Sequence, residues 1–197
     1  MKRAALTLSA AVPLLIAAAA PQPAAAQTIV PLPSFAAVEL NGGGKVRLRH
    51  GPVQRVTILR GDPRVSRIEV ERQDRGRNGT LVIDACRRSC RNYSLEVEIV
   101  TPGIAAIAVR GGGRIDALGA FPARGDLGVA VGGGGVIDAR ALPARNVGAA
   151  VNGGGRILTR ASASLGAAIS GGGQIVYWGN PAISTAINGG GVVTRGK

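Results

Sequence analysis

The stretch Ile107-Ala108-Val109-Arg110-Gly111-Gly112-Gly113-Arg114-Ile115-Asp116 decides the fold, because the chain repeats its pattern four more times. Each copy has a short apolar run, a triple glycine and a second short apolar run. The copies begin at residues 129, 149, 167 and 185, so the spacing falls from 22 to 20 and then to 18 residues. Such a period predicts a stack of small units, each of which needs its neighbours to bury its apolar face.

Stacking would align equivalent residues of the copies into two inward-facing ladders, since neighbouring strands lie about 4.8 Å apart. The ladders are Val109, Val131, Val151, Ile169 and Ile187 in the first run, and Ile115, Ile137, Ile157, Ile175 and Val193 in the second. Alanine precedes each member of the first ladder, which predicts a flat outer face. The glycines suit corners with positive φ or close backbone packing. We therefore expect an all-β fold, a β-solenoid (β-helix) of about five short coils over residues 104–197.

Residues 27–103 follow a different pattern, in which polar and apolar side chains alternate. Candidate strands cover residues 46–49, 54–58, 67–71, 80–84 and 94–99, with glycine- and proline-containing turns between several of them. Alternation with period two is typical of half-buried strands. The sequence predicts an antiparallel β region that caps the solenoid.

Residues 1–26 have the pattern of a signal peptide. A basic start is followed by an almost entirely apolar run from Ala4 to Ala20, and Ala24-Ala25-Ala26 offers a cleavage site before Gln27. Proline residues keep the apolar run too short for a transmembrane span. We expect export, which leaves the periplasm, the cell surface and the medium open. Loss of Lys2 and Arg3 with the leader would reduce the net charge from +13 to +11.

The composition excludes two broad classes of protein. Hydrophobic residues make up 46% of the chain, which is too many for a disordered polyelectrolyte despite the basic charge. Aromatic residues make up only 3%, while there are 31 glycines, so an ordinary thick core is not expected. Thin coils filled with small residues fit both numbers.

The two cysteines, Cys86 and Cys90, lie between the candidate strands 80–85 and 93–101. In an exported chain such a pair predicts a disulfide, here closing the loop of a β-hairpin. A metal site is the alternative, but no third ligand lies nearby and the only histidine, His50, is remote in sequence. No metal or cofactor is expected.

The chain resembles a known family. Ile99-Val100-Thr101-Pro102-Gly103 leads into Ile107-Ala108-Val109, and Asn- or Ser-Gly-Gly-Gly stretches follow. Together with the strand region before them, these features resemble DUF2807, the adhesin-like head GIN domain, over residues 34–195. The resemblance implies a bacterial cell-envelope protein of β-helical fold with no established activity.

Asp116 and Asp138 are the candidate catalytic residues. They occupy equivalent places in successive coils, so stacking would put their carboxylates about 5 Å apart, the separation found in retaining glycosidases. The third to fifth copies have Leu158, Val176 and Thr194 there, and no aromatic sugar platform is evident in the solenoid. A surface charge ladder, neutralised by Arg114 and Arg156, is the favoured interpretation, and polysaccharide cleavage is the alternative.

Basic residues gather before residue 92 and form the candidate binding site. The densest groups are Arg72, Arg75 and Arg77 in one segment, and Arg87, Arg88 and Arg91 in another. A solvated basic surface is one interpretation. Attachment to anionic polysaccharide or lipid headgroups is the other, since arginine suits carboxylate and phosphate. Specific nucleic-acid binding is not expected, because aromatic residues for stacking bases are scarce.

These observations predict a non-enzymatic module of the cell envelope that adheres to an anionic surface. A third hypothesis is a structural protein that self-associates, because the edge of the C-terminal coil would be open to pairing.

Overall fold

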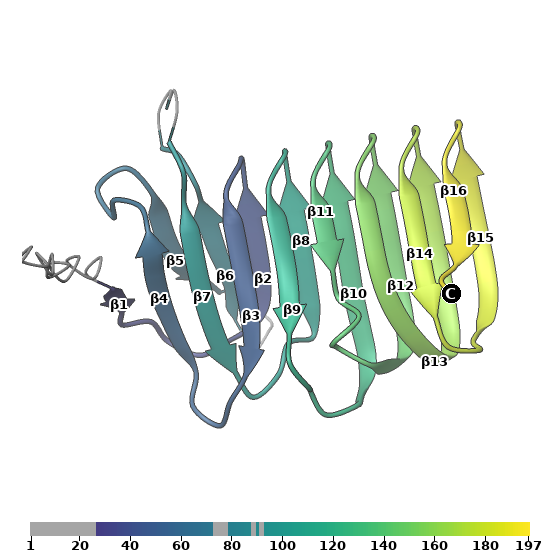
Figure 1. Ribbon diagram of the computed structural model, residues 1–197, viewed down its shortest axis with the longest axis horizontal. Helices are drawn as coiled ribbons and strands as arrows, with labels where there is room; N and C mark the ends of the chain where they lie inside the picture. Colours follow the sequence, from purple (N-terminus) through teal and green to yellow (C-terminus); the bar gives the residue numbers. More distant parts are fainter. Residues whose placement is uncertain (1–26, 73–78, 88–89, 91–92) are drawn as a thin grey trace, which may run out of the picture.

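The computed structural model describes residues 27–72, 79–87, 90 and 93–197. The predicted leader, residues 1–26, lies outside this part of the chain. The described residues form sixteen β-strands and no helix, which confirms the all-β class (Figure 1). None of them forms a helix long and apolar enough to span a membrane.

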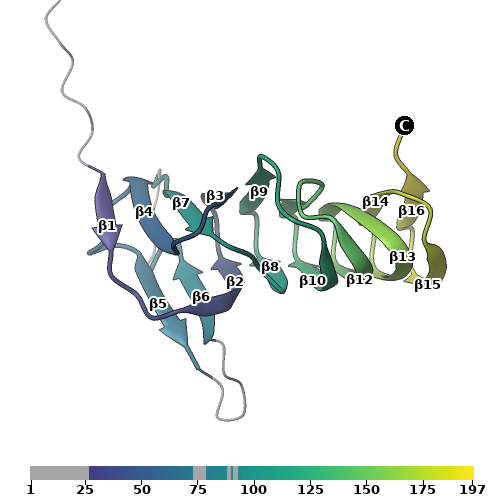
Figure 2. The ribbon, with the colours of Figure 1, turned by 90° about the horizontal axis from the view of Figure 1, so that it is seen from below.

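The strands form two facing sheets, and Figure 2 shows them from below. In order, sheet A contains β1 (Thr28–Val30), β4 (Arg55–Arg60), β7 (Glu96–Thr101), β3 (Lys45–His50), β9 (Arg114–Leu118), β11 (Val136–Asp138), the first part of β13 (Arg156–Ser170), β14 (Gln174–Trp178) and β16 (Val192–Arg195). Sheet B contains β5 (Arg67–Glu71), β6 (Gly79–Asp84), β2 (Phe35–Asn41), β8 (Ala106–Arg110), β10 (Arg124–Gly132), β12 (Ala144–Asn152), the second part of β13 and β15 (Ala182–Asn188). Strand β13 passes from sheet A into sheet B and so belongs to both.

Each Gly-rich repeat forms one unit, here called a coil, made of a sheet B strand, a glycine corner and a sheet A strand. Successive coils pair in parallel and in register, so that Val131 lies beside Val109 and Val151, and Ile137 beside Ile115 and Ile157. The corners follow one edge of the molecule in Figure 1. Identical register explains why the same residue type recurs at each ladder position.

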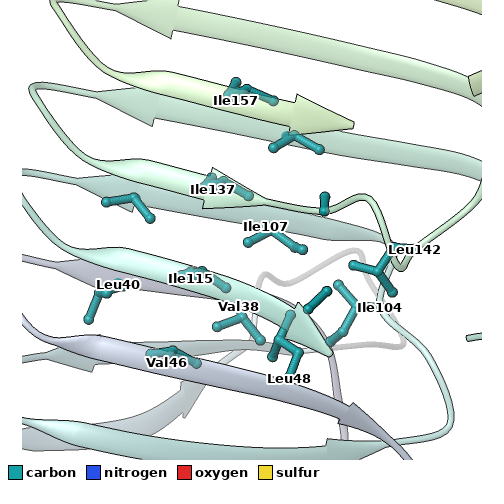
Figure 3. Close-up of a cluster of buried hydrophobic side chains, with 14 of the residues drawn as sticks. Val38, Leu40, Val46, Leu48, Ile104, Ile107, Ile115, Ile137, Leu142 and Ile157 are labelled. Atoms are coloured by element: carbon teal, nitrogen blue, oxygen red, sulfur yellow. The ribbon is translucent and has the colours of Figure 1, made fainter. Parts of the chain in front are cut away.

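The core is a thin layer of aliphatic side chains between the two sheets. Ile107, Ile115, Ile137 and Ile157 are at most 2% exposed, and Figure 3 shows them interleaved from opposite strands. Branched side chains fill most of this narrow space, and Phe35 and Phe121 are the buried aromatic residues of the described core, which is consistent with the low aromatic content. Burial of such side chains is the main stabilising term of the stack.

Two of the three glycines in a corner are required by the packing. Gly153 has a φ of +117°, and a Cβ there would lie 2.8 Å from the carbonyl oxygen of Gly133 in the preceding corner. A Cβ at Gly155 would collide with the side chain of Val131. The middle glycine, Gly154, has nothing within 4 Å of the corresponding position. Close stacking of corners therefore selects glycine at the first and third positions only.

The N-terminal region differs from the antiparallel sheet expected for residues 27–103. Strands β2 and β3 form a coil with a Gly42-Gly43-Gly44 corner, which pairs in parallel with β8 and β9. On its other side β6 and β7 also pair in parallel with β2 and β3. Antiparallel pairing among the described strands is limited to β1 with β4, β4 with β7, and β5 with β6. Alternating polarity identifies a strand but carries no information on the direction of its partner.

The disulfide between Cys86 and Cys90 is confirmed, with their Cα atoms 6.1 Å apart. The expected hairpin is wrong, because β6 lies in sheet B and β7 in sheet A. The described ends of the loop between them lie against the Gly42-Gly43-Gly44 corner: Ala85 donates to the Asn41 carbonyl, and Lys45 donates to the Leu95 carbonyl. The disulfide loop thus stands where the other coils have a triple glycine.

The coil of β15 and β16 is open on one side within the described chain. Ile183 and Ile187 face the core direction but are 45% and 46% exposed. Their register partners in β13, Leu165 and Ile169, are 1% and 2% exposed. The difference arises because each coil is covered by its neighbours, and β15 has a neighbour on only one side.

Candidate functional site

Asp116 and Asp138, the candidate catalytic pair, are register partners on β9 and β11. Asp116 is 8% exposed; its Oδ2 accepts a hydrogen bond from Arg114 Nε at 2.9 Å, and its Oδ1 lies 2.7 Å from Arg114 Nη2 in an ion pair. The ammonium group of Lys45 lies 3.8 Å from its Oδ2. Both carboxylate oxygens are therefore engaged by a neighbouring guanidinium.

Asp138 has its own arginine. Arg140 donates to it from Nε at 2.9 Å, from Nη2 at 2.6 Å and from its backbone N–H at 3.3 Å. Burial alone would raise the pKa of Asp138, but these hydrogen bonds and the charges of Arg140 and Arg114 outweigh it, so the pKa lies below its ordinary value. Asp138 thus stays ionised, which is unsuitable for the general acid of a glycosidase.

The surface charge ladder fits this geometry better than a catalytic dyad. Arg114 neutralises Asp116 as expected, whereas Arg140, and not Arg156, neutralises Asp138. Each acid pairs with an arginine two residues away in the sequence, Arg114 on the same strand as Asp116 and Arg140 just beyond the end of β11, and this spacing is visible in the sequence.

Two residues of the predicted basic site, Arg72 and Arg87, belong to the described chain, and both are exposed. Arg75, Arg77, Arg88 and Arg91 lie outside it. Arg72 follows Glu71, which pairs with Thr80 at one end of the β5–β6 ladder. Arg87 lies beyond Asp84 at the other end. Arg72 and Arg87 are therefore not brought together into one patch.

Most acidic side chains of the described residues form ion pairs. Of the ten acids among the described residues, eight are paired: Glu39, Glu69, Glu71, Asp84, Glu96, Glu98, Asp116 and Asp138. They engage seven cations, four of which lie in the N-terminal region: Lys45, Arg47, Arg49 and Arg67. Pairing at the N-terminal end removes part of the charge excess that the sequence places there.

The remaining cations form no ion pair within the part of the chain that the structure describes. They are Arg55, Arg60, Arg64, Arg72, Arg87, Arg124, Arg145, Arg156, Arg160, Arg195 and Lys197. Six of them lie beyond residue 110, on the stacked coils. The uncompensated positive charge is thus spread along the molecule and is not confined to its N-terminal end.

The outer face of sheet B is flat, as the alanine pattern predicts. Gly128, Gly148 and Gly166 form one row across the coils, and Ala108, Ala130, Ala150, Ala168 and Ala186 form the next. The alanine row lies in a shallow trough bordered by Arg110, Asn152, Ser170 and Asn188. On the glycine side, Ser164 donates to Asn146, which donates to Asp126. Small side chains with polar borders leave this face accessible to an extended partner.

The described residues contain no group of three or more His, Cys, Asp or Glu side chains that could hold a metal ion. The ring of His50 packs edge-on against Phe121, with 5.5 Å between the ring centroids. Its position gives no support for metal or nucleophilic chemistry.

Comparison with protein families identifies two matching segments, residues 34–124 and 123–181, both to DUF2807, described as "Putative auto-transporter adhesin, head GIN domain". The chain belongs to the DUF2807 family. Comparison with curated proteins finds no match.

Among solved structures, the DUF2807 chain is similar to a putative adhesin from Bacteroides fragilis, with 19% identity and a TM-score of 0.51 over 86% of this chain and 96% of that one. A putative lipid binding protein from Parabacteroides distasonis has 16% identity and a TM-score of 0.41, covering 87% and 96%. A putative cell adhesion protein from Clostridium sporogenes has 14% identity and a TM-score of 0.39, covering 86% and 98%. At these identities the first similarity supports the fold only.

Two features of this DUF2807 chain escaped the sequence interpretation. Asn41-Gly42-Gly43-Gly44 has the same four residues as Asn152–Gly155 and Asn188–Gly191, and it marks a further coil within the N-terminal region. Trp178, in β14, lies beside two arginines at the end of sheet A. The first had a clear sequence signal. The second had none, because Arg140, Arg160 and Trp178 are about 20 residues apart and only coil stacking joins them.

Proposed function

We propose that this chain is an exported, non-enzymatic module of the bacterial cell envelope that adheres to an anionic polymer, with an acidic glycan as its first ligand class. Its stacked coils serve as a rigid β-solenoid scaffold. The observation that carries the proposal is the set of exposed arginines without acidic partners, while most acids are already neutralised. Unpaired guanidinium groups suit carboxylates and phosphates.

Export is supported by the leader pattern of residues 1–26, by the Cys86–Cys90 disulfide and by membership of an adhesin-like family. Periplasm, cell surface and medium are all compatible with it. Arg72 and Arg87, with Arg75, Arg77, Arg88 and Arg91 in the same two segments, are the residues we propose to meet the polymer first. The flat face of sheet B is a second contact surface for an extended chain.

Binding to immobilised polygalacturonate, with neutral dextran as the control polymer, tests the proposal. Affinity should fall by about tenfold or more between about 20 and about 200 mM salt, because exposed charges are screened. Vesicles of phosphatidylglycerol, compared with phosphatidylcholine, show whether lipid headgroups are the better ligand. Binding that is insensitive to salt, or absent at low salt, would contradict attachment by uncompensated charge.

A matched pair of double variants separates net charge from contact. Arg72→Gln with Arg87→Gln removes two uncompensated charges, whereas Arg47→Gln with Arg49→Gln removes two that pair with Glu96 and Glu98. Both change the net charge equally. The Arg72 and Arg87 double variant should weaken binding several-fold more than the Arg47 and Arg49 double variant. Equal weakening by the two would show that Arg72 and Arg87 do not contact the polymer.

Self-association is the second candidate function, and the exposure of Ile183 and Ile187 favours it. Strands β15 and β16 each present an edge that another copy could extend. Polysaccharide cleavage is not favoured, because Arg114 and Arg140 engage both carboxylates. Replacing Asp116 and Asp138 together by Asn should leave any hydrolysis unchanged.

A further inference from the structure

A hollow lies where the chain leaves sheet A, at the ends of β9, β13's first part and β14. Its walls include Phe121, Arg140, Pro143, Arg160 and Trp178. The volume of the hollow is about 490 Å³. That size falls in the range of pockets that hold small ligands. Residues from four successive coils contribute to it, so the site exists only because the coils stack.

Trp178 is held in place as one wall of the hollow. Its Nε1 donates a hydrogen bond to the carbonyl oxygen of Lys197 at 3.1 Å. A Cβ at Gly196 would collide with the indole ring, so the ring lies directly against that backbone. The Arg140 guanidinium carbon lies 5.2 Å from the ring centroid, within range of a cation–π interaction. An aromatic wall fixed by three contacts loses little conformational entropy when a ligand binds.

The two arginines of the hollow differ in their electrostatic state. Arg140 is neutralised by the two-pronged contact with Asp138. Arg160 pairs in register with Trp178, is exposed, and has no ion pair within the described residues. An anion entering the hollow would therefore be held by Arg160, while Arg140 keeps the indole ring in position.

We propose that this hollow binds one acidic sugar unit, a ring that carries a single carboxylate or phosphate. Arg160 would hold the anionic group in a two-point contact, and the apolar face of the sugar would lie against Trp178. The proposal rests on the proposed function, since it assigns one specific subsite for the acidic glycan. It differs from that function in being local, because general attachment by surface charge needs no hollow.

Trp178 is the only tryptophan of the chain, so its fluorescence reports on this hollow alone. Trigalacturonate and glucose 6-phosphate serve as carboxylate and phosphate probes, with maltotriose as the neutral control. The acidic probes should change the fluorescence in a saturable manner at low salt, and maltotriose should not. The better of the two acidic probes identifies the preferred anionic group.

Arg160→Gln should weaken binding of the acidic probes by about tenfold, as expected for loss of a charge-assisted hydrogen-bonded pair. Arg156→Gln is the matched control, because Arg156 is on the same strand, exposed and without an ion pair, but outside the hollow. The Arg156→Gln variant should bind the acidic probes with the same affinity as the unaltered protein. Unfolding temperatures of both variants verify that the fold is retained.

The outcomes separate this proposal from the proposed function. An unsaturable fluorescence response, or equal weakening by Arg156→Gln and Arg160→Gln, overturns the hollow as a site. If polygalacturonate is still bound in that case, general charge attachment survives. If the polymer is not bound but the small acidic probes saturate with dependence on Arg160, the hollow stands and the adhesion function falls.

Discussion

Arg140 sets the protonation state of Asp138 and thereby limits what this carboxylate can do. The pKa of Asp138 is lowered in the folded protein, so its ionised form stabilises the fold above its unfolded pKa of about 3.9. That stabilisation disappears as the pH falls through the lower pKa of the folded state. A proton donor needs the opposite shift, and the pairing therefore favours a structural role.

Replacing Asp138 by Asn should lower the free energy of unfolding by about 1 kcal/mol at pH 7, as expected for a partly exposed ion pair. The difference from the unaltered protein should shrink as the pH falls below the unfolded pKa and vanish once the pH lies below the lower pKa of the folded state, because the native carboxyl is then protonated as well. Urea unfolding of both proteins at pH 7, 4 and 2 measures this difference in the free energy of unfolding. Asp126→Asn is the control, since Asp126 forms no ion pair with any residue that the structure describes, and the side-chain oxygen of an Asn there can still accept from Asn146. Equal pH dependence in both variants would contradict the role of Arg140.

Among elements, the glycine corner shows how stacking limits the sequence. Gly153→Ala should destabilise the protein by about 3 kcal/mol, because alanine is strained at a φ of +117° and its Cβ meets the Gly133 carbonyl. Gly154→Ala should be neutral or stabilise by up to about 1 kcal/mol, since the position is open and alanine reduces the entropy of the unfolded chain. Thermal unfolding compares these adjacent substitutions. If both destabilise equally, close corner stacking does not explain the triple glycine.

Prediction from sequence succeeds where an element repeats and fails where it occurs once. Val109, Val131 and Val151 show by recurrence alone that their positions are equivalent, and strand pairing places them side by side. The Cys86–Cys90 loop has no such copy, so a hairpin and a corner between sheets were equally compatible with its flanking strands. The polarity pattern of β6 and β7 does not distinguish a hairpin from a corner, because a strand shows the same pattern whether it lies in sheet A or in sheet B.

Across the whole molecule, stacking creates surfaces that no single segment contains. The flat face of sheet B and the hollow at Trp178 each draw on several coils, with one or a few residues from each. The uncompensated positive charge is also spread over the whole described chain, since cations without an ion pair remain both in the N-terminal region and on the coils. Coil position therefore adds a candidate binding residue, Arg160, that the local density of arginine in the sequence does not indicate.

The open coil of β15 and β16 leads to the last prediction, on assembly. If a second copy covers Ile183 and Ile187, each chain would gain strand pairing along both edges and bury two half-exposed side chains. The end of a two-sheet stack is small, so we expect a weak dimer that forms at micromolar or higher concentration. Sedimentation at several concentrations should show it, and Ile187→Lys should abolish it by placing charge in the contact. Ser184→Lys, on the outer face of the same strand, is the control that should leave the dimer intact. A sedimentation coefficient that stays monomeric at every concentration would exclude this contact, whereas disruption by Ser184→Lys but not by Ile187→Lys would place the interface on the outer face of sheet B.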